Sequence, residues 1–538
     1  MDTDVLVVGA GPTGLMLANE LARRGVRALI VDRHSGPSLQ TRALGVQART
    51  LEIYSHLGIA DRALELGKRT IGANMWAQGR RAARVPVGDI GRNLSPFPFL
   101  LILGQDDNER LLGEALGRSG MTVQWNTELV GLVQEADRVI TQLKQPDGTI
   151  REVTAAWVAG CDGARSAVRE LSGIRFEGAP YEEVFFVADT EMTGPMVPDE
   201  LNVYLWRKGF HLFFPMRGIN HWRVVGIVPP ALRGRDDLTL DDVTPSIRKE
   251  AGSGLVFQRC SWFSTYRIHH RRAEHFRDRR CFLLGDAAHI HSPVGAQGMN
   301  TGLQDAYNLG WKLALVVSGA ADAGLLDSYE AERIPVAQRL LSTTDRAFSL
   351  VVSNTTLTGL LRTRVVPKII AVAMRLERVR RLAFRAISQI GIHYRDSALS
   401  ETLPGLSAGP RAGDRFPWLR PTFSVNNPPE DLYRKLDDKR FTLIVVGQPA
   451  SPAGLAGLED LVSILVIPSD PANERELARV QIPRIAFYLL RPDGHIALCG
   501  IQLDAAGVTR YLSLRMGLRT PRLSHQIPSL SPHRGAVR

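Results

Sequence analysis

The order of apolar and polar positions at the start of the chain predicts a strand, a tight turn, a helix and a second strand. Residues 5–8 are apolar and lead into the glycine-rich stretch GAGPTG, and residues 15–24 then place apolar side chains on one helical face. A second apolar run over residues 27–31 ends at Asp32. We therefore expect the chain to begin with the first unit of an α/β fold.

Each glycine of this stretch has its own role in the prediction. Gly9 permits the sharp turn, Gly11 lets a pyrophosphate approach the backbone, and Gly14 allows the helix to pack closely on the strand. Asp32 follows Gly14 by eighteen residues, where a carboxylate accepts a hydrogen bond from a ribose hydroxyl. Its neighbour Arg33 is a further candidate for cofactor binding. The pattern predicts a site for an adenine dinucleotide and does not distinguish FAD from NAD.

Two later segments again lead from a strand into a loop. An apolar strand over residues 157–160 runs into Asp162-Gly163 and Arg165, a pattern that by itself fits a polar surface turn equally well. Another apolar strand, over residues 281–284, runs into Gly285-Asp286, a loop rich in proline and glycine, and then a helix. Carboxylates at strand ends suit sugar hydroxyls, and amides at a helix N-terminus suit developing negative charge. One nucleotide held by segments so far apart is an elongated ligand.

Taken together, the three segments resemble a known family. GAGPTG with Asp32, then CDGARSAVR, then GDAAHIHSPVGAQGMNTGLQDAYNLGWKL are similar in order and spacing to the GxGxxG, DG and GD motifs of class A FAD-dependent aromatic monooxygenases. This is the family of the para-hydroxybenzoate, phenol and polyketide hydroxylases. Weaker similarities lie around Arg42 and Gln105 and in SYEAERIPVAQRLL. One departure concerns the flavin loop, where Ala296 stands at a position that is commonly glycine in the family.

The resemblance implies an α/β fold with several domains. A Rossmann-like FAD-binding domain comes from residues 1–180 and 273–345, and a β-sheet substrate domain is inserted at residues 181–272. Residues 401–516 are similar to the thioredoxin-like C-terminal domain of the longer hydroxylases. Because this domain lacks a CxxC pair, we expect it to be redox-inert and a candidate surface for a homodimer. The tail, residues 517–538, is rich in Pro, Ser and Arg and is predicted to be disordered.

The resemblance also implies roles for individual residues. Asp32 binds the adenosine ribose of FAD, and Asp286 binds the ribityl or pyrophosphate region. Pro293 lies near the reactive C4a of the flavin and is a catalytic candidate. Asp162 and Arg165 serve FAD and NAD(P)H jointly. The other implied cofactor-binding residues are Gly9, Gly11, Gly14, Arg42, Gln105, Gly298, Met299 and Asn300.

The reaction of the family uses NAD(P)H to reduce FAD, after which reduced FAD and O2 give a C4a-hydroperoxide. Its distal oxygen is transferred to an electron-rich carbon of a phenolic or polycyclic aromatic substrate. The surplus of arginine favours NADPH, because the additional phosphate suits a guanidinium group. Two alternatives stay open: another FAD oxidoreductase acting by dehydrogenation, epoxidation or Baeyer–Villiger insertion, and a non-catalytic flavin-binding module.

The inserted region contains a second catalytic candidate. Residues 201–228 alternate like two antiparallel strands joined by a polar turn, which would form the sheet of the substrate domain. Tyr204, Trp206, His211 and Phe213 share one parity of this alternation with some slippage. His211 is therefore either a base that faces the pocket or a half-buried strand histidine, and the second interpretation is favoured.

Residues 346–400 form a basic helical segment. Within it, residues 356–392 carry eight basic residues and one acid, Glu377, among aliphatic residues. A helix on a membrane surface is one interpretation. Pro367 interrupts the pattern, however, and basic helices also occur at domain seams, so membrane contact is not the favoured interpretation.

The C-terminal region predicts further β-structure. A linker rich in Pro and Gly occupies residues 404–421. Strands are expected over three apolar segments, the last of them a hairpin turning at Pro492-Asp493-Gly494. The three segments are FTLIVVG from residue 441, LVSILVIP from residue 461 and RIAFYLLRPDGHIALCG from residue 484.

Composition narrows the remaining function classes. The 538 residues are 44% hydrophobic and 22% charged, which is typical of a globular chain with several domains. The four cysteines form no CxxC pair or metal-ligand cluster, so no bound metal is expected. The absence of a signal segment and of long apolar runs favours a cytoplasmic protein. The net charge of +11 is not accompanied by a nucleic-acid-binding motif, so an aromatic small molecule and O2 are the expected partners.

Overall fold

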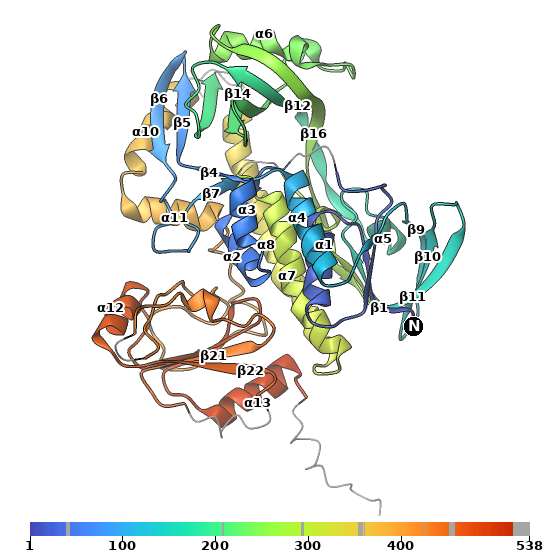
Figure 1. The fold of residues 1–538 in the computed structure, drawn as a ribbon, viewed down its shortest axis with the longest axis vertical. Coiled ribbons are helices and arrows are strands. Elements are labelled where there is room, and N and C mark those ends of the chain that lie inside the picture. The colour runs from blue at the N-terminus through green and yellow to red at the C-terminus, as the bar shows by residue number, and fades with distance from the viewer. Residues whose placement is uncertain are drawn as a thin grey trace, which may run out of the picture. The chain divides into compact units, whose positions relative to one another are not determined.

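A computed structural model describes residues 1–38, 43–206, 209–291, 295–352, 359, 361–424, 427–450 and 458–519. The chain divides into two compact units (Figure 1). Unit 1 comprises Met1–Trp311 and Tyr329–His393, and unit 2 comprises Lys312–Ser328 and Tyr394–Arg538. Most of the tail that the sequence predicts to be disordered, residues 520–538, lies outside the described residues, as do Arg42 and Pro293.

The first sheet of unit 1 is built on the N-terminal strand. β1 (Thr3–Val8) lies between β2 (Ala28–Val31) and β11 (Ile150–Gly160) and is parallel to both, and α1 (Pro12–Ala22) connects β1 to β2. Five of the six β1 residues are buried, as expected for a parallel strand covered on both faces. The strand order is β17-β18-β11-β1-β2-β8, and β9 and β10 extend β11 antiparallel. The further strands are β8 (Val123–Gln124), β9 (Glu128–Gln134), β10 (Val139–Lys144), β17 (Arg277–Asp278) and β18 (Cys281–Leu283).

Helices of unit 1 pack beside this sheet and carry much of the buried apolar surface (Figure 1). α1 packs against α4 (Gln105–Arg118), where Asn19 Nδ2 donates to the Leu112 carbonyl at 2.9 Å. The other helices here are α2 (Ala48–His56), α3 (Ala60–Leu66), α5 (Ala167–Leu171), α7 (Gly298–Val317) and α8 (Asp327–Val352). Unit 1 also contains a small three-stranded sheet of order β3-β7-β4. Its strands are β3 (Gly45–Val46), β4 (Lys68–Thr70) and β7 (Leu100–Ile102).

The second sheet of unit 1 is dominated by two long antiparallel strands, β12 (Phe176–Thr193) and β16 (Val256–Ala273). Its order is β19-β16-β12-β15-β14-β13-β5-β6. One face packs against α6 (Leu240–Ala251) through a cluster that includes Phe186, Tyr204 and Phe213. The remaining strands are β5 (Gly72–Ala77), β6 (Arg80–Pro86), β13 (Leu201–Trp206), β14 (Gly209–Pro215), β15 (His221–Ile227) and β19 (His289–Ile290).

Residues 201–228 form three strands, where the sequence predicts two. β13 ends at Trp206 and β14 begins at Gly209, and the pair is antiparallel with Tyr204 opposite His211. A second turn, with Ile219 at its exposed tip, leads into β15. Tyr204 on β13 lies directly opposite His211 on β14, so an even-numbered and an odd-numbered residue share one face. This accounts for the slippage in parity noted in the sequence.

The described part of the basic segment contains several short helices. A short π-helical turn, η4 (Leu361–Val365), precedes α10 (Val366–Ala373) and α11 (Glu377–Ile387). Pro367 lies in the first turn of α10, a position that proline favours, so it starts a helix instead of interrupting one. Among the residues that the structure describes, no helix has the length and hydropathy needed to span a bilayer.

Unit 2 is a five-stranded mixed sheet of order β20-β24-β23-β21-β22 with a buried apolar core. β21 (Phe441–Val446) pairs parallel with β22 (Val462–Ile467), and β23 (Ala486–Leu490) forms the predicted hairpin with β24 (Ile496–Gly500). The other elements are β20 (Glu401–Thr402), α12 (Pro471–Arg479), α13 (Ala505–Met516) and the single turns η3 (Ala323–Leu326) and η5 (Leu432–Arg434). Leu518 forms a bridge with Ala321, so the chain is packed beyond residue 517, where the predicted tail begins.

Candidate functional site

The turn after β1 explains why three glycines are present. Gly9 has a φ of +100°, and a Cβ there would lie 2.4 Å from the carbonyl oxygen of Cys161. A Cβ on Gly14 would lie 1.9 Å from the carbonyl oxygen of Gly9, so both positions require glycine for close packing. A Cβ on Gly11 would meet no atom within 4 Å, because Gly11 borders a cavity. Gly11 also precedes α1 without a side-chain cap, which favours an anion at this helix N-terminus.

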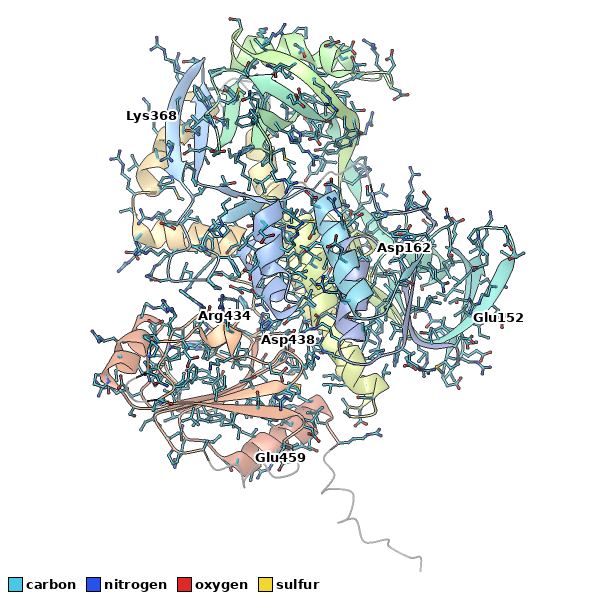
Figure 2. All side chains as sticks on the ribbon, in the orientation of Figure 1. Glu152, Asp162, Lys368, Arg434, Asp438 and Glu459 are labelled. Carbon is cyan, nitrogen blue, oxygen red and sulfur yellow. The ribbon has the colours of Figure 1, made fainter. Side chains whose placement is uncertain are left out.

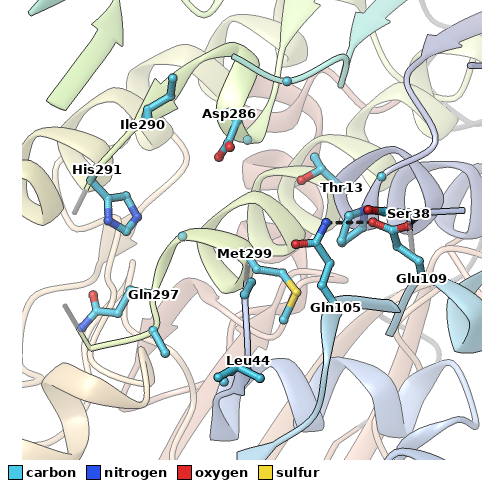
Figure 3. A pocket seen from close by; sticks show the side chains of 18 of the residues that line it. Thr13, Ser38, Leu44, Gln105, Glu109, Asp286, Ile290, His291, Gln297 and Met299 are labelled. Atoms are coloured by element: carbon cyan, nitrogen blue, oxygen red, sulfur yellow. Dashed lines mark hydrogen bonds between the residues drawn. The ribbon is translucent and has the colours of Figure 1, made fainter. Parts of the chain in front are cut away.

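The cavity has a volume of about 1280 Å³ and extends from the glycine turn to the second sheet (Figure 3). Its described lining comes from unit 1 and includes all three segments that the sequence singled out. The predicted candidates that line it are Gly9, Gly11, Asp32, Arg33, Gln105, Asp162, Arg165, Asp286, Gly298 and Met299. Gly14, Asn300 and His211 are not among the lining residues.

Acidic side chains gather at the end of the cavity next to β2. Asp32 Oδ2 accepts a hydrogen bond from the Ala10 N–H at 2.7 Å, so Asp32 also braces the glycine turn. Glu109, which the sequence analysis did not single out, accepts from the Ser38 N–H at 2.9 Å and from Gln105 Nε2 at 2.8 Å (Figure 3). Burial raises the pKa of the Glu109 carboxyl. Its sequence signal is its place one helical turn after Gln105 on α4.

The DG segment lies half-buried at the end of β11. Asp162, labelled in Figure 2, accepts at Oδ2 from the Val168 N–H at 3.2 Å, whereas its buried Oδ1 has no hydrogen-bond partner among the described residues. Burial raises the pKa of the Asp162 carboxyl. Arg169, which the sequence analysis left without a role, donates from Nη1 to the Ala287 carbonyl at 3.0 Å. Arg169 thereby connects the DG segment to the GD loop, which explains a buried arginine at this position.

The GD loop follows β18 as a single turn, η2 (Gly285–Ala287). A Cβ on Gly285 would lie 2.6 Å from Thr13 Oγ1, so the loop packs closely on the first turn of α1. Asp286 itself is exposed and points into the cavity (Figure 3). The tight contact through Gly285 therefore places a carboxylate close to the helix N-terminus that begins at Gly11.

A buried cluster of three ionisable side chains holds the GD loop from behind. Asp305 on α7 accepts from His289 Nε2 at 2.7 Å and from Arg333 Nε at 2.6 Å. The Asp305 carboxylate also accepts from the Gly285 N–H at 3.0 Å. Arg333 and His289 hold the pKa of the Asp305 carboxyl below its usual value although burial opposes them. We call these residues the Asp305 cluster.

Asn300 connects the start of α7 to the neighbouring segments instead of facing the cavity. Its Oδ1 accepts from the Gln47 N–H at 2.9 Å, and its Nδ2 donates to the Gly45 carbonyl at 2.8 Å. Ala296 in the preceding loop has a φ of +52°, a conformation that favours glycine. A Cβ on Gly45 would lie 2.5 Å from Ala296 Cβ. The glycine at position 45 therefore makes the room that alanine at position 296 needs.

The opposite end of the cavity is apolar. β13 and β14 contribute every second residue to it, as expected for one face of a sheet. Polar groups here are few and include Tyr266, His291 and Gln297. The apolar lining residues comprise Phe99, Phe185, Leu201, Val203, Leu205, Phe210, Leu212, Phe214, Val225, Ile290, Phe384 and Ile387.

His211 lies on the other face of this sheet. It alternates with the cavity-lining Phe210 and Leu212, and its ring contacts Trp206 with centroids 4.2 Å apart. The ring is fully buried, neither nitrogen has a hydrogen-bond partner, and burial lowers the pKa of His211 to about 3. The structure therefore corrects the interpretation of His211 as a base that faces the pocket, because its side chain lies on the face of β14 away from the cavity. It agrees with the favoured interpretation of a strand histidine, although the ring is fully and not half buried.

The polar end of the cavity fits an adenine dinucleotide. The space beside Gly11 would be filled by any side chain, the adjacent helix N-terminus suits a pyrophosphate, and carboxylates flank both. The buried Oδ1 of Asp162 can accept a hydrogen bond from such a ligand. FAD would be held by Gly11, Asp32, Asp162 and Asp286.

Comparison with known proteins identifies the family. Residues 2–344 match the family model described as FAD binding domain. The chain is 34% identical to 6-methylpretetramide 4-monooxygenase of Streptomyces rimosus, over 94% of this chain and 92% of that protein. It is 33% identical to pentachlorophenol 4-monooxygenase of Sphingobium chlorophenolicum, over 92% and 86% respectively.

A solved structure extends the similarity to the fold. Anhydrotetracycline hydroxylase from Streptomyces rimosus superposes with a TM-score of 0.76 at 29% identity, covering 96% of this chain and 99% of that one. The matched family model, the relatives along nearly the whole chain and the dinucleotide-binding end of the cavity agree. The chain belongs to the class A FAD-dependent aromatic monooxygenases.

Proposed function

We propose that this enzyme uses NADPH and O2 to hydroxylate a phenolic, polycyclic aromatic substrate. The observation that carries the proposal is the continuity of the cavity, which joins the dinucleotide-binding turn to an apolar chamber under the second sheet. Bound FAD supplies hydride acceptance and O2 activation. The chain contributes an apolar lining that excludes water and a helix N-terminus, at Gly298 and Met299, that favours negative charge on the reduced ring.

The substrate class is supported by the lining of the apolar chamber. Phe185, Phe210 and Phe214 offer large flat surfaces, and among its described residues no Lys or Arg faces this end. A neutral polycyclic phenol suits such a chamber better than a small aromatic acid, whose carboxylate would lack a cationic partner. The curated relatives named above include a monooxygenase of 6-methylpretetramide and one of pentachlorophenol.

The proton of the phenol needs an acceptor within the cavity, and we assign this role to His291. It lies at the apolar end, and a Cβ on Gly298 would be 3.3 Å from its Nε2, so the ring is beside the start of α7. His291→Asn is expected to lower kcat by about a hundredfold and to shift the acidic limb of the pH profile. The matched control is His211→Asn, away from the cavity, for which the shape of the pH profile stays unchanged.

Anaerobic reduction of the bound flavin tests the reaction. Loss of visible absorption is followed after mixing with NADPH or NADH, with and without a panel of phenols from one ring to four. We expect faster reduction by NADPH than by NADH and acceleration by a polycyclic phenol. Reduction that ignores every phenol would favour a different oxidoreductase, and no reduction by either nucleotide would favour a flavin-binding module.

For residues 401–516 we propose a redox-inert domain that is similar to thioredoxin. Support comes from the mixed sheet with its terminal hairpin and from Cys499, the one cysteine of this region, which is buried. Burial raises the pKa of the Cys499 thiol, so it is a poor nucleophile. Cys499→Ser should therefore leave NADPH-dependent turnover unchanged.

A further inference from the structure

The outward surface of η4, α10 and α11 combines aliphatic and basic side chains, and we call it the basic helical patch. Within the part of the chain that the structure describes, it carries a large share of the exposed aliphatic residues. Ile369, Val372, Leu376 and Leu382 are 59%, 61%, 61% and 71% exposed. Scattered single apolar residues are normal at a protein surface, but a group on two consecutive helices marks an interaction surface.

The same surface is strongly positive. Residues 363–387 contain seven basic residues and one acid, Glu377, which pairs with Arg381 at 3.1 Å. On α11, the spacing of Arg378, Arg381 and Arg385 places them on one face, and Leu382 lies beside them. On α10, Lys368 is exposed next to Ile369 (Figure 2). Basic and aliphatic side chains therefore lie beside each other on the patch, and they do not form separate charged and apolar faces.

The exposed residues are not the side chains through which α10 and α11 pack on unit 1, because other side chains of both helices form that contact. Phe384 of α11 is buried against Gly91, where a Cβ would lie 2.2 Å from its ring. At the end of α11, the Ser388 carbonyl accepts from the Arg49 N–H at 3.3 Å. α10 buries Pro367 and packs against β6. The outward side chains thus remain exposed after the helices have docked on unit 1.

We propose that the basic helical patch docks the enzyme on the surface of an anionic lipid bilayer. Lysine and arginine interact with acidic headgroups, and adjacent aliphatic side chains enter the headgroup boundary. A second copy of the chain is a poor occupant, because two positive patches would repel each other. A nucleic acid or a purely acidic protein would use the charges and leave the aliphatic residues without a partner. Neither helix spans the bilayer, so the contact is peripheral.

The position of α11 connects the bilayer contact to the substrate cavity, an argument that rests on the proposed function. Phe384 and Ile387 of this helix line the apolar end of the cavity. The helix that meets the bilayer is therefore also a wall of the chamber for an apolar aromatic substrate. Such a substrate partitions into lipid, and a docked enzyme would meet it there.

Vesicle co-sedimentation of the full-length, FAD-loaded enzyme tests the proposal. The probes are vesicles of pure phosphatidylcholine and vesicles in which about a third of it is replaced by phosphatidylglycerol. We expect binding to the anionic vesicles only, decreasing as NaCl is raised to several times the physiological concentration. Equal binding to both vesicle types, or none to either, would overturn the proposal.

Two triple variants separate the charged from the apolar contribution. R378Q/R381Q/R385Q should weaken binding on the order of a hundredfold, because each surface arginine contributes about a factor of five near an anionic bilayer. I369S/V372S/L382S should weaken it about tenfold or more through the lost apolar contacts. The matched control R62Q/R118Q/R151Q removes three exposed arginines elsewhere and should bind like the wild type.

Each outcome bears on the occupant of the patch. If the apolar triple variant binds as well as the wild type while the arginine variant does not, the partner is simply anionic and the bilayer proposal is wrong. If the control loses as much binding as R378Q/R381Q/R385Q, net charge and not this patch is responsible, which also contradicts it. Visible absorption of bound FAD shows that each variant is folded, and reduction by NADPH in solution should be unchanged.

Discussion

The two units of this enzyme each contain a buried aspartate that binds one histidine and one arginine. In unit 1 it is the Asp305 cluster, with His289 and Arg333. In unit 2, Asp493 Oδ1 accepts from Arg491 Nε at 3.1 Å and lies 3.3 Å from His495 Nδ1. All six side chains are almost fully buried, and in both units the basic partners lower the pKa of the aspartate.

The two clusters differ in how far apart their members lie in the sequence. His289 and Arg333 are separated from Asp305 by 16 and 28 residues. Arg491 and His495 are each only 2 residues from Asp493 and close the turn of one hairpin. The same chemistry therefore fixes the GD loop against two helices in one unit and shapes a local turn in the other. Equal burial does not imply an equal role.

Removal of the carboxylate charge from the long-range cluster is expected to have the largest effect. Asp305→Asn leaves the buried Arg333 without its negative partner and loosens the contact to the Gly285 N–H, so we expect a loss of about 4 to 5 kcal/mol in unfolding free energy. Hydrogen exchange of peptides that cover β18 and α7 measures it, and bound FAD should fall in parallel.

Asp286→Ala provides the contrast for Asp305→Asn. Because Asp286 is exposed in the cavity, its loss should weaken FAD binding while the exchange of the same peptides in the apoprotein stays unchanged. Full FAD occupancy in both variants would contradict the assignment of the GD loop to the cofactor.

The local cluster should show a smaller and more confined effect. Asp493→Asn is expected to cost about 3 kcal/mol, because a hairpin turn can shift and let water reach Arg491. Peptides that cover β23 and β24 should exchange faster, with FAD content and NADPH oxidation retained. A loss of FAD comparable to that of Asp305→Asn would show that the two clusters are not distinct in role.

His211 is a buried histidine without a carboxylate partner, and it should make the free energy of unfolding depend on pH. Its pKa of about 3 in the folded chain lies below the value of about 6.5 in the unfolded chain, so only the unfolded chain binds a proton between these values. The free energy of unfolding should therefore fall by about 1.4 kcal/mol per pH unit as pH decreases from 6.5. Asp305 and Asp493 add no slope there, because carboxyls with lowered pKa lose their contribution only below about pH 4.

His211→Phe should reduce the slope by this amount, and the contribution of His269, whose pKa burial also lowers, should remain. Urea denaturation at pH 7, 6 and 5 measures it, with Asp493→Asn as the variant in which the slope should persist. An unchanged slope in His211→Phe would mean that the proton is taken up elsewhere.

The smallest effect is expected at an exposed ion pair next to the local cluster. Arg395 Nε donates to Asp414 Oδ1 at 2.7 Å, but the arginine side chain is 53% exposed. Arg395→Gln should cost less than about 1 kcal/mol by urea denaturation, since water and salt screen such pairs. A loss close to that of Asp493→Asn would contradict the role given to burial.

The sequence predicts those elements whose determining interactions lie within one short segment of the chain. The strand, turn and helix at residues 3–22 are confirmed, because the glycine positions and the hydrophobic period are local. The Asp493 hairpin was likewise visible as a turn. The roles of Arg169 and Asp305 were not visible, because each binds a segment more than fifteen residues away. The shared parity of Tyr204, His211 and Phe213 is confirmed, but the alternation of residues does not show on which face of the sheet the cavity lies.

The sequence also does not predict how Gly45 makes room for Ala296 in the flavin loop. Ala296 can be recognised as a departure from the family, but the space that it needs is provided by Gly45, a residue 251 positions earlier. Only the fold brings the two together. A family pattern therefore predicts where the site lies better than how one chain accommodates its own exceptions.

The make-up of unit 2 has a consequence for anyone who wishes to express part of this enzyme. Residues 312–328 belong to this unit although they precede it by more than sixty positions, and Asp322 pairs with Arg519 at 2.8 Å. A stop codon after His393 would leave the end of α7 and the η3 turn without the strands and helices on which they pack. Truncation should thus give aggregation instead of a smaller enzyme, and a soluble fragment would need a redesigned connection in place of residues 312–328.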